Sequence, residues 1–522
     1  MKLSYAVSVA AIALAACTTN QIQYLTRPPF NPPVDSAAGF LGFYTVSTKQ
    51  TTCGNCHVDH QATWALTKHA AAHDDLAAAG SGTNKSCIGC HDVSEQGNLA
   101  TGPAAFNKVQ DSTYYDVQCE NCHGPGYTHA TNPQITNVPL ARVAVDTTKY
   151  GCGGCHTGNH EPFVQEWQQS LHSVLVAPAQ GNAACMSCHE GKAALASWGV
   201  YAIYPHADSV TNLPQTCVVC HDPHGSPNTA QLRFPINSPD ENVNLCMHCH
   251  ARTAEPIVGN TATSSHGGPH APQGPMIDGV AGYFPPGTSY DTTLLTTSHG
   301  SSANPNLCAG CHVYAFTVTD QVTGAFKLSV VGHSFYPTPC LDNTGAPNGL
   351  NTCARPGDAT FTPTTRSFLA CAASGCHAST AAAQSAFQAN RGNIALLVNT
   401  LWNDVNGNQK LDTFPIDSGY LAQIYEKNKA DLTNATAVTP AEGCLFDAQM
   451  LGENLAANGD RSYGVHNPFL AAALLQSCIT ELQGQYAYLA PPPPMVQAIL
   501  DGPLAGLRSV PKRAEAAMRV GR

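Results

Sequence analysis

The chain repeats the pattern C-x-x-C-H eight times between Cys53 and His312. In this pattern the two thiols add across the vinyl groups of a porphyrin, and the histidine that follows them ligates the iron. The cysteines of the eight copies are Cys53, Cys56, Cys87, Cys90, Cys119, Cys122, Cys152, Cys155, Cys185, Cys188, Cys217, Cys220, Cys246, Cys249, Cys308 and Cys311. The proximal histidines that follow them are His57, His91, His123, His156, His189, His221, His250 and His312. The repetition predicts eight covalently attached c-type haems.

Zinc is the competing interpretation, because cysteine pairs at this spacing also build zinc ribbons and knuckles. A zinc array does not require a histidine directly after every second cysteine, yet all eight pairs have one. We therefore expect haem at each copy.

A ninth attachment site is predicted at Cys371, Cys376 and His377, where four residues instead of two lie between the cysteines. The wider spacing resembles attachment sites in some small tetrahaem cytochromes. If both cysteines hold haem, and Cys17 has a separate use, an even set of thiols remains and pairs by proximity. The predicted disulfides are Cys340 with Cys353 and Cys444 with Cys478. The alternative is a disulfide that uses Cys371, with no ninth haem.

The N-terminus predicts export and lipidation. Residues 1–16 contain Lys2 and a short alanine-rich apolar run, which is typical of a signal peptide and too short to span a bilayer. The run ends at Leu14-Ala15-Ala16-Cys17, which resembles the bacterial lipobox, at which Cys17 becomes the lipidated first residue. We expect an outer-membrane lipoprotein that faces the periplasm or the cell exterior. The alternative is ordinary signal cleavage with Cys17 as a spare thiol.

Composition supports a haem protein and argues against a nucleic-acid partner. Only 11% of the residues are charged, against about 25% in an average soluble domain. Haem faces replace part of the side-chain core in such a chain. The formal net charge of −11 opposes binding to a polyanion.

The predicted fold is mainly α with much irregular loop and few or no sheets. Residues 17–50 form a lipidated, proline-containing tether, and residues 51–377 form the multihaem region, in which glycine and proline allow only short helices. Residues 378–522 form a haem-poor helical region. Helices are expected at Gln61–Ala79, Pro162–Val176, Glu190–Ser197, Thr380–Asn403 and from Asn467–Pro468 to Leu489.

Fourteen histidines lie outside the attachment motifs, enough to give every iron a second, distal histidine. Two of them follow a tryptophan at the same spacing, Trp64 to His69 and Trp167 to His172. The predicted distal ligands are His69, His129, His172, His206, His224, His266, His299, His333 and His466. The histidines left unassigned are His60, His73, His160, His248 and His270. Ligation by two histidines gives a low-spin iron with no position for a substrate.

The chain resembles bacterial multihaem c-type cytochromes over about residues 51–377 and again around His466. The resemblance implies that residues 464–472 place His466 at a helix start as a distal ligand, with a helix cap that has no iron contact as the alternative. A weaker pattern alternates oxygen side chains as a calcium loop does, at Asp404, Asn406, Asn408 and Asp412. Gln409 and Pro415 depart from that pattern, and a polar turn is the alternative.

Three functions fit these motifs. The first is electron transfer through about nine haems at the outer membrane, to other cytochromes, an outer-membrane conduit or an extracellular acceptor. The second is a multihaem oxidoreductase that acts on nitrogen or sulfur oxyanions or on hydroxylamine, which needs an iron with a free coordination site. No C-x-x-C-K motif supplies one, so we assign no catalytic residue and expect a carrier. The third is a subunit of a polymeric haem filament.

Overall fold

A computed structural model describes residues 30–145, 150–200, 206–208, 211–258, 268–288, 295–320, 322–341, 366–434, 436–453, 455 and 458–502. The predicted signal peptide, Cys17, His266 and Cys353 lie outside the described residues. Within the described ranges, no helix combines the length and the apolar character that crossing a bilayer requires.

The described chain forms two compact units. Unit 1 contains the chain up to Ser94 together with Gly102–Glu120 and Pro125–Pro139. Unit 2 contains Glu95–Thr101, Asn121–Gly124 and the chain from Leu140 onward.

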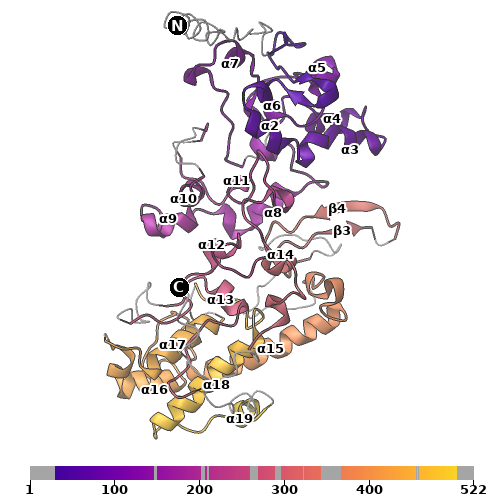
Figure 1. Cartoon of the computed structure of the whole chain (residues 1–522). Helices are drawn as coiled ribbons and strands as arrows, with labels where there is room; N and C mark the ends of the chain where they lie inside the picture. Colours follow the sequence, from indigo (N-terminus) through magenta and orange to yellow (C-terminus); the bar gives the residue numbers. More distant parts are fainter. Residues whose placement is uncertain are drawn as a thin grey trace, which may run out of the picture. The chain divides into compact units, whose positions relative to one another are not determined.

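Unit 1 consists of short helices around a two-stranded antiparallel sheet (Figure 1). Its elements are β1 (Phe43–Thr45), β2 (Gln50–Thr51), α2 (Val58–Trp64), α3 (Ala72–Ala78), α4 (Lys85–His91), α5 (Phe106–Val109) and α7 (Tyr127–Thr131), and α6 (Cys119–His123) begins in it. The predicted helix over Gln61–Ala79 is divided, because the Thr67 hydroxyl donates to the carbonyl of Trp64 and ends α2 there. The Trp64 indole N–H then donates to the carbonyl of Val117 at 2.9 Å.

The first part of unit 2 carries most of the attachment motifs on equally short helices. Its elements are α8 (Phe163–Gln169), α9 (Ala183–His189), α10 (Gly191–Ser197), α11 (Cys217–Cys220), α12 (Met247–His250), α13 (Gln273–Ile277), α14 (Leu307–His312), β3 (Phe316–Thr319) and β4 (Phe326–Val330). Strands β3 and β4 pair antiparallel. The predicted helix over Pro162–Val176 stops at Gln169, where the Ser170 hydroxyl donates to the carbonyl of Trp167. The predicted helix at Glu190–Ser197 is α10.

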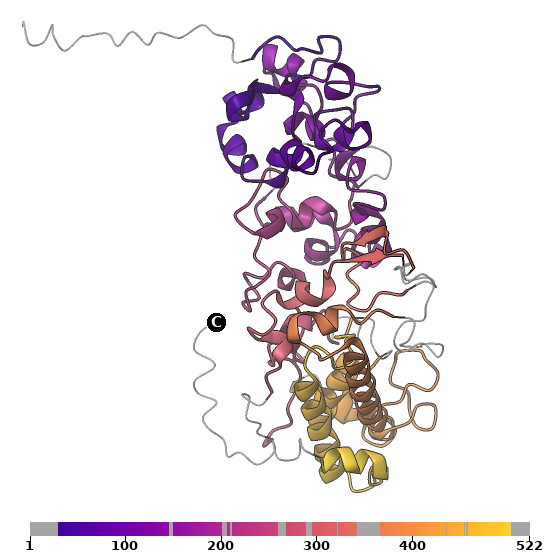
Figure 2. The same cartoon turned by 90° about the vertical axis from the view of Figure 1, so that its right-hand side faces the viewer.

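The second part of unit 2 is a helical bundle with the main apolar core of the chain. It contains α15 (Thr380–Leu401), α16 (Tyr420–Lys427), α17 (Pro440–Leu451), α18 (Pro468–Gln485) and α19 (Pro494–Leu500). Figures 1 and 2 show α15, α17 and α18 side by side. Leu397, Phe446 and Leu474 are fully buried between them. The predicted disulfide between Cys444 and Cys478 is confirmed and joins α17 to α18.

The two long predicted helices are confirmed as α15 and α18. Each begins at an N-cap residue whose side chain accepts a backbone N–H of the first turn. Ser379 caps α15 by accepting the N–H of Ala382, and Asn467 caps α18 by accepting the N–H of Leu470. The predicted end of the second helix at Leu489 is wrong, since α18 ends at Gln485. The mainly α fold with much loop is confirmed, with two small two-stranded sheets among the described residues.

Candidate haem-binding sites

The attachment cysteines lie on short helices or single turns that end at or beside the proximal histidine. In α4, α9 and α14 the C-x-x-C-H motif forms the last turn of the helix. All eighteen predicted attachment thiols, including Cys371 and Cys376, are outside disulfides. Cys340 is disulfide-bonded, whereas its predicted partner Cys353 is not described. The free thiols are therefore those that the motifs assign to haem.

Seven proximal histidines lie opposite a second histidine ring at nearly constant distance. The ring centroids are 6.4 Å apart for His57 and His129, and 6.2 Å for His123 and His224. The remaining pairs are His221 with His333 at 6.2 Å, His250 with His172 at 6.1 Å, His189 with His270 at 5.9 Å, His312 with His466 at 6.2 Å and His377 with His299 at 6.4 Å.

This spacing fits two imidazoles that share one iron. A metal–imidazole bond is about 2 Å long and the ring centre lies about 1 Å beyond the nitrogen, so two opposed ligands have centroids about 6 Å apart. Rings stacked face to face lie much closer, as His73 and Tyr115 do at 3.5 Å. The pairs therefore suit axial ligation of haem better than ring stacking.

Hydrogen bonds at Nδ1 turn the other nitrogen of several rings toward the partner ring. The Nδ1 atoms of His221, His299 and His312 lie 2.7, 2.7 and 2.8 Å from backbone carbonyl oxygens. Nδ1 of His466 lies 2.6 Å from Oδ1 of the buried Asp460. A metal-bound histidine usually donates its second ring N–H to such an acceptor, which leaves Nε2 for the metal.

Burial determines the charge state of most of these rings. Loss of solvent lowers the pKa of His172 to about 3 and that of His312 to about 4. Imidazole binds a metal in its neutral form, and these environments favour that form. His466 differs, because burial lowers its pKa but the Asp460 carboxylate outweighs burial and raises it above the ordinary value.

The structure brings six of the nine predicted distal histidines opposite a proximal ring: His129, His172, His224, His299, His333 and His466. Of the other three, His69 lies on a single helical turn, Lys68–Ala71. His206 accepts the N–H of Asp208 at Nδ1, and His266 is not described.

Sequence reasoning missed His270, which it left unassigned although its ring faces that of His189. His270 forms a β-bridge with Thr253, just after the seventh motif. No spacing rule links it to the fifth motif, so only the fold reveals the pair. The other unassigned ring near a proximal histidine is His60, whose centroid is 6.3 Å from that of His57. His60 follows His57 by one helical turn and so lies on the same side as His57, whereas His129 comes from a separate helix.

Two proximal histidines, His156 of the fourth motif and His91 of the second, are not among these seven pairs. Nδ1 of His156 lies 3.5 Å from Oε2 of Glu161, and its ring lies edge-on to that of Phe163. His91 differs further from the paired rings. Its Nδ1 lies 3.1 Å from the carbonyl oxygen of Ala72. Within the described residues, no histidine ring lies opposite it in the way that His270 lies opposite His189.

Attachment cysteines of different motifs contact one another. The thiols of Cys53 and Cys119 lie close enough to interact in unit 1. In unit 2 the equivalent thiol pairs are Cys152 with Cys217, Cys188 with Cys249 and Cys246 with Cys308. These contacts bring neighbouring attachment sites close together.

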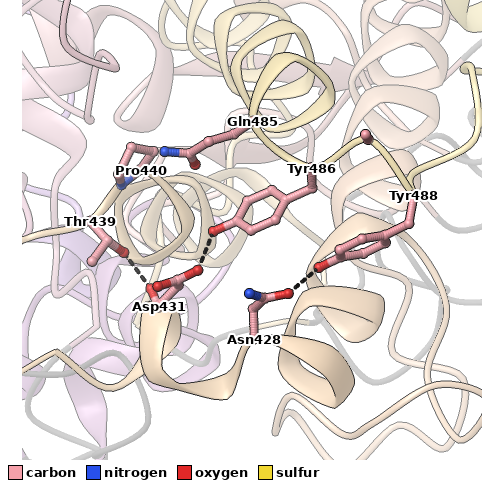
Figure 3. A pocket seen from close by; sticks show the side chains of 8 residues that line it. Asn428, Asp431, Thr439, Pro440, Gln485, Tyr486 and Tyr488 are labelled. Carbon is pink, nitrogen blue, oxygen red and sulfur yellow. Dashed lines mark hydrogen bonds between the residues drawn. The ribbon is translucent and has the colours of Figure 1, made fainter.

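Two further features lie away from the attachment motifs. A pocket of about 500 Å³ is lined by Asp431 and Tyr486, joined by a 2.8 Å hydrogen bond, and by Asn428 and Tyr488, joined by another (Figure 3). The residues of the predicted calcium loop form an exposed turn, in which the side-chain amides of Asn406 and Asn408 donate to Oδ2 of Asp412. Asp404 accepts the N–H of Gly407. Calcium binding stays a prediction.

Comparison with known proteins gives two family matches. Residues 52–124 match the model of cytochrome c554 and c-prime, and residues 212–255 match the doubled CXXCH motif. These two segments together include the first, second, third, sixth and seventh motifs.

A curated relative and a solved structure are also similar. The "Multiheme cytochrome MtrA" of Shewanella baltica (strain OS185) is 28% identical over 190 residues, which is 33% of this chain and 54% of that protein. The chain thus spans about half the length of this relative. The crystal structure of the outer cell wall cytochrome OcwA is 20% identical, with 76% of each chain covered and a TM-score of 0.41.

Proposed function

Because this chain is a bacterial multihaem c-type cytochrome, we propose that it carries electrons through about nine covalently attached haems, with two axial histidines at each of the seven paired sites. When bound, haem c supplies reversible one-electron chemistry. The cysteines hold each haem covalently, the paired histidines fix the iron in a low-spin state, and the contacts between motifs place neighbouring haems close together.

The set of seven opposed histidine pairs is the observation that carries this proposal. Two histidines on one iron leave no orbital for a substrate, and they hold the ligands fixed while the iron changes charge. The hydrogen bonds at Nδ1 keep the rings in position. Such a site is suited to passing an electron and unsuited to binding a small molecule.

We further propose that the protein works at the outer membrane. Cys17 at the end of the apolar run supports a lipid anchor, and the acidic composition opposes nucleic acid as a partner. The partners we propose are other cytochromes, an outer-membrane conduit or an extracellular acceptor. If the anchor exists, Cys17→Ala moves the protein from the membrane fraction to the soluble fraction. Wild-type protein in the soluble fraction contradicts it.

Two other functions remain as alternatives. A multihaem oxidoreductase acting on nitrogen or sulfur oxyanions or on hydroxylamine needs an open iron, which the paired histidines do not offer. A haem filament needs a histidine from one copy to ligate iron in the next. The seven pairs lie within one copy of the chain and therefore favour a self-contained carrier.

Electron paramagnetic resonance on the purified holoprotein, together with its intact mass after acid denaturation, tests the proposal. We expect low-spin signals from the paired sites and a mass that carries nine haems. A mass with eight haems contradicts the ninth site. Predominantly high-spin iron, or rapid turnover of nitrite or hydroxylamine, contradicts the electron carrier and favours the enzyme.

A further inference from the structure

The seventh attachment site, Cys246, Cys249 and His250 on α12, has three neighbouring sites. The carbonyl oxygen of Phe335 lies 2.8 Å from Nδ1 of His312 in the eighth site, and the Phe335 ring centroid lies 4.4 Å from that of His172, which is opposite His250. The thiols of Cys249 and of Cys188 in the fifth site lie close enough to interact. Cys220 of the sixth site lies close enough to interact electrostatically with both cysteines of the seventh.

Backbone pairing connects the fifth and seventh sites independently of these sulfur contacts. His270, which faces His189 of the fifth site, donates its N–H to the carbonyl of Thr253 at 3.0 Å. Arg252 donates its N–H to the carbonyl of Ala271 at 3.1 Å. Residues 252 and 253 directly follow the seventh motif, so the distal ligand of the fifth site is fixed to the end of the seventh.

A side-chain contact strengthens this connection. Oε1 of Gln273, three residues after His270, lies 3.3 Å from Nδ1 of His250. The segment 270–273 therefore touches the axial histidines of both sites. Two backbone hydrogen bonds and one side-chain contact thus join the fifth and seventh sites within unit 2.

The eighth and ninth sites continue in another direction. His466 faces His312 of the eighth site, and His299 faces His377 of the ninth. The Nδ1 of His299 lies 2.7 Å from the carbonyl oxygen of Val465, the residue before His466. At the other side, Cys152 of the fourth site contacts Cys217 of the sixth.

We propose, on the basis of the electron-transfer function above, that the attachment sites of unit 2 branch at the seventh site. The fourth, sixth, seventh, eighth and ninth sites form a row, and the fifth site is a side branch that joins it at the seventh. The fifth site also touches the segment before the sixth motif, where the Gln215 side chain donates to the carbonyl of Cys188 at 2.8 Å. Helix α9, which carries the fifth motif, has no buried residue. The branch therefore ends at the protein surface, where it offers a second point of electron exchange.

A double-mutant cycle on reduction potentials tests the branch. Methionine as an axial ligand raises the potential of a c-type haem, so His270→Met marks the fifth site and His172→Met marks the seventh. Neighbouring charged sites influence each other's titration. In the double variant, the marked haem that is reduced second takes up its electron beside a haem that is already reduced. We therefore expect its potential to be lower than in the corresponding single variant.

His299→Met, which marks the ninth site, provides the matched control. With His270→Met it forms a distant pair, for which we expect additive potentials. Equal coupling in both double variants, or no coupling between the fifth and seventh sites, overturns the branch. All variants keep every attachment cysteine, and their intact mass shows that no haem is lost.

The same experiment separates the branch from the function on which it rests. If a single methionine variant leaves every potential and the absorption spectrum unchanged, the histidine is not a ligand and the proposed ligation fails. If the single variants raise one potential each but the cycle shows no coupling, only the branch fails.

Discussion

Residues 53–129 and residues 152–226 build the same three-motif arrangement twice, and we refer to them as the first and second modules. In both, a tryptophan indole donates to a backbone carbonyl near the third motif: Trp64 to Val117 and Trp167 to Gln215. The residue that accepts the indole bond also donates its own N–H, from Val117 to the carbonyl of His69 and from Gln215 to the carbonyl of His172. The first and third motifs also meet through Cys53 with Cys119 and Cys152 with Cys217.

The differences between the modules show what the shared scaffold leaves free. The first module buries Glu120 directly after Cys119, where the second buries Val218 after Cys217. The middle motif of the second module faces His270, whereas His91 of the first lies against a backbone carbonyl. The scaffold thus fixes where haem is attached, and residues that the modules do not share determine the environment of each iron.

The largest expected effect comes from removing one distal histidine in each module. His129→Ala and His224→Ala should each leave one iron with a single histidine, because the ring centroids lie 6.4 and 6.2 Å from those of His57 and His123, the spacing of two imidazoles on one iron. We expect one additional carbon monoxide bound per protein, measured by titration of the reduced form, and a new high-spin signal.

The control for this pair is His160→Ala, whose side chain is 81% exposed. It should bind no more carbon monoxide than the wild type. If the control gains as much as His129→Ala and His224→Ala, the ring pairs do not describe the ligands.

A smaller effect is expected from the carboxylate that only the first module buries. Three backbone N–H groups, from Leu41, Gly42 and Gly126, donate to Glu120. Burial outweighs these bonds and raises the pKa of Glu120 from 4.5 to about 7. The folded state therefore keeps a proton that the unfolded state releases between these two values. Stability should fall by about 3 kcal/mol as the pH rises through this window.

Glu120→Gln should remove this pH dependence, because the amide does not titrate. The pH dependence is measured as the melting temperature of each holoprotein, followed by Soret circular dichroism. The range from about pH 4 to about pH 8 covers the window in which the proton is released. Glu255→Gln, at an exposed position, should retain the wild-type slope. An unchanged slope in Glu120→Gln would show that another group causes the pH dependence.

The two tryptophans should have matched effects. Trp64→Phe and Trp167→Phe each keep an aromatic ring but leave a buried carbonyl without its donor, at Val117 and Gln215 respectively. We expect a loss of about 2 kcal/mol in each variant, measured by chemical denaturation. A large loss in only one variant would break the equivalence of the modules.

The sequence predicts the features that depend on local chemistry. The attachment motifs, the capped starts of α15 and α18 and the disulfide between Cys444 and Cys478 all follow from short patterns. The interruption after Trp64 does not, because it depends on a carbonyl at Val117 that only the fold brings near. The axial pairs are less predictable still. His466 lies just before a recognisable helix start, but its position opposite His312 depends on a long-range contact. No local sequence pattern marks His270.

The smallest expected effect concerns the helices that carry the middle motif of each module. Asn84 caps α4 by accepting the N–H of Ser86, and Asn182 caps α9 by accepting the N–H of Ala184. Removing such a cap typically costs about 1 kcal/mol, so Asn84→Ala and Asn182→Ala should each lower stability by this amount without loss of haem. Asn84→Asp and Asn182→Asp keep a capping oxygen and should behave as the wild type in chemical denaturation. Helix α9 is also held by the contact of its His189 with His270, and α4 has no such contact among the described residues. If the two alanine variants lose unequal amounts of stability, the loss should therefore be greater in Asn84→Ala. A greater loss in Asn182→Ala would show that the distal histidine does not stabilise its helix.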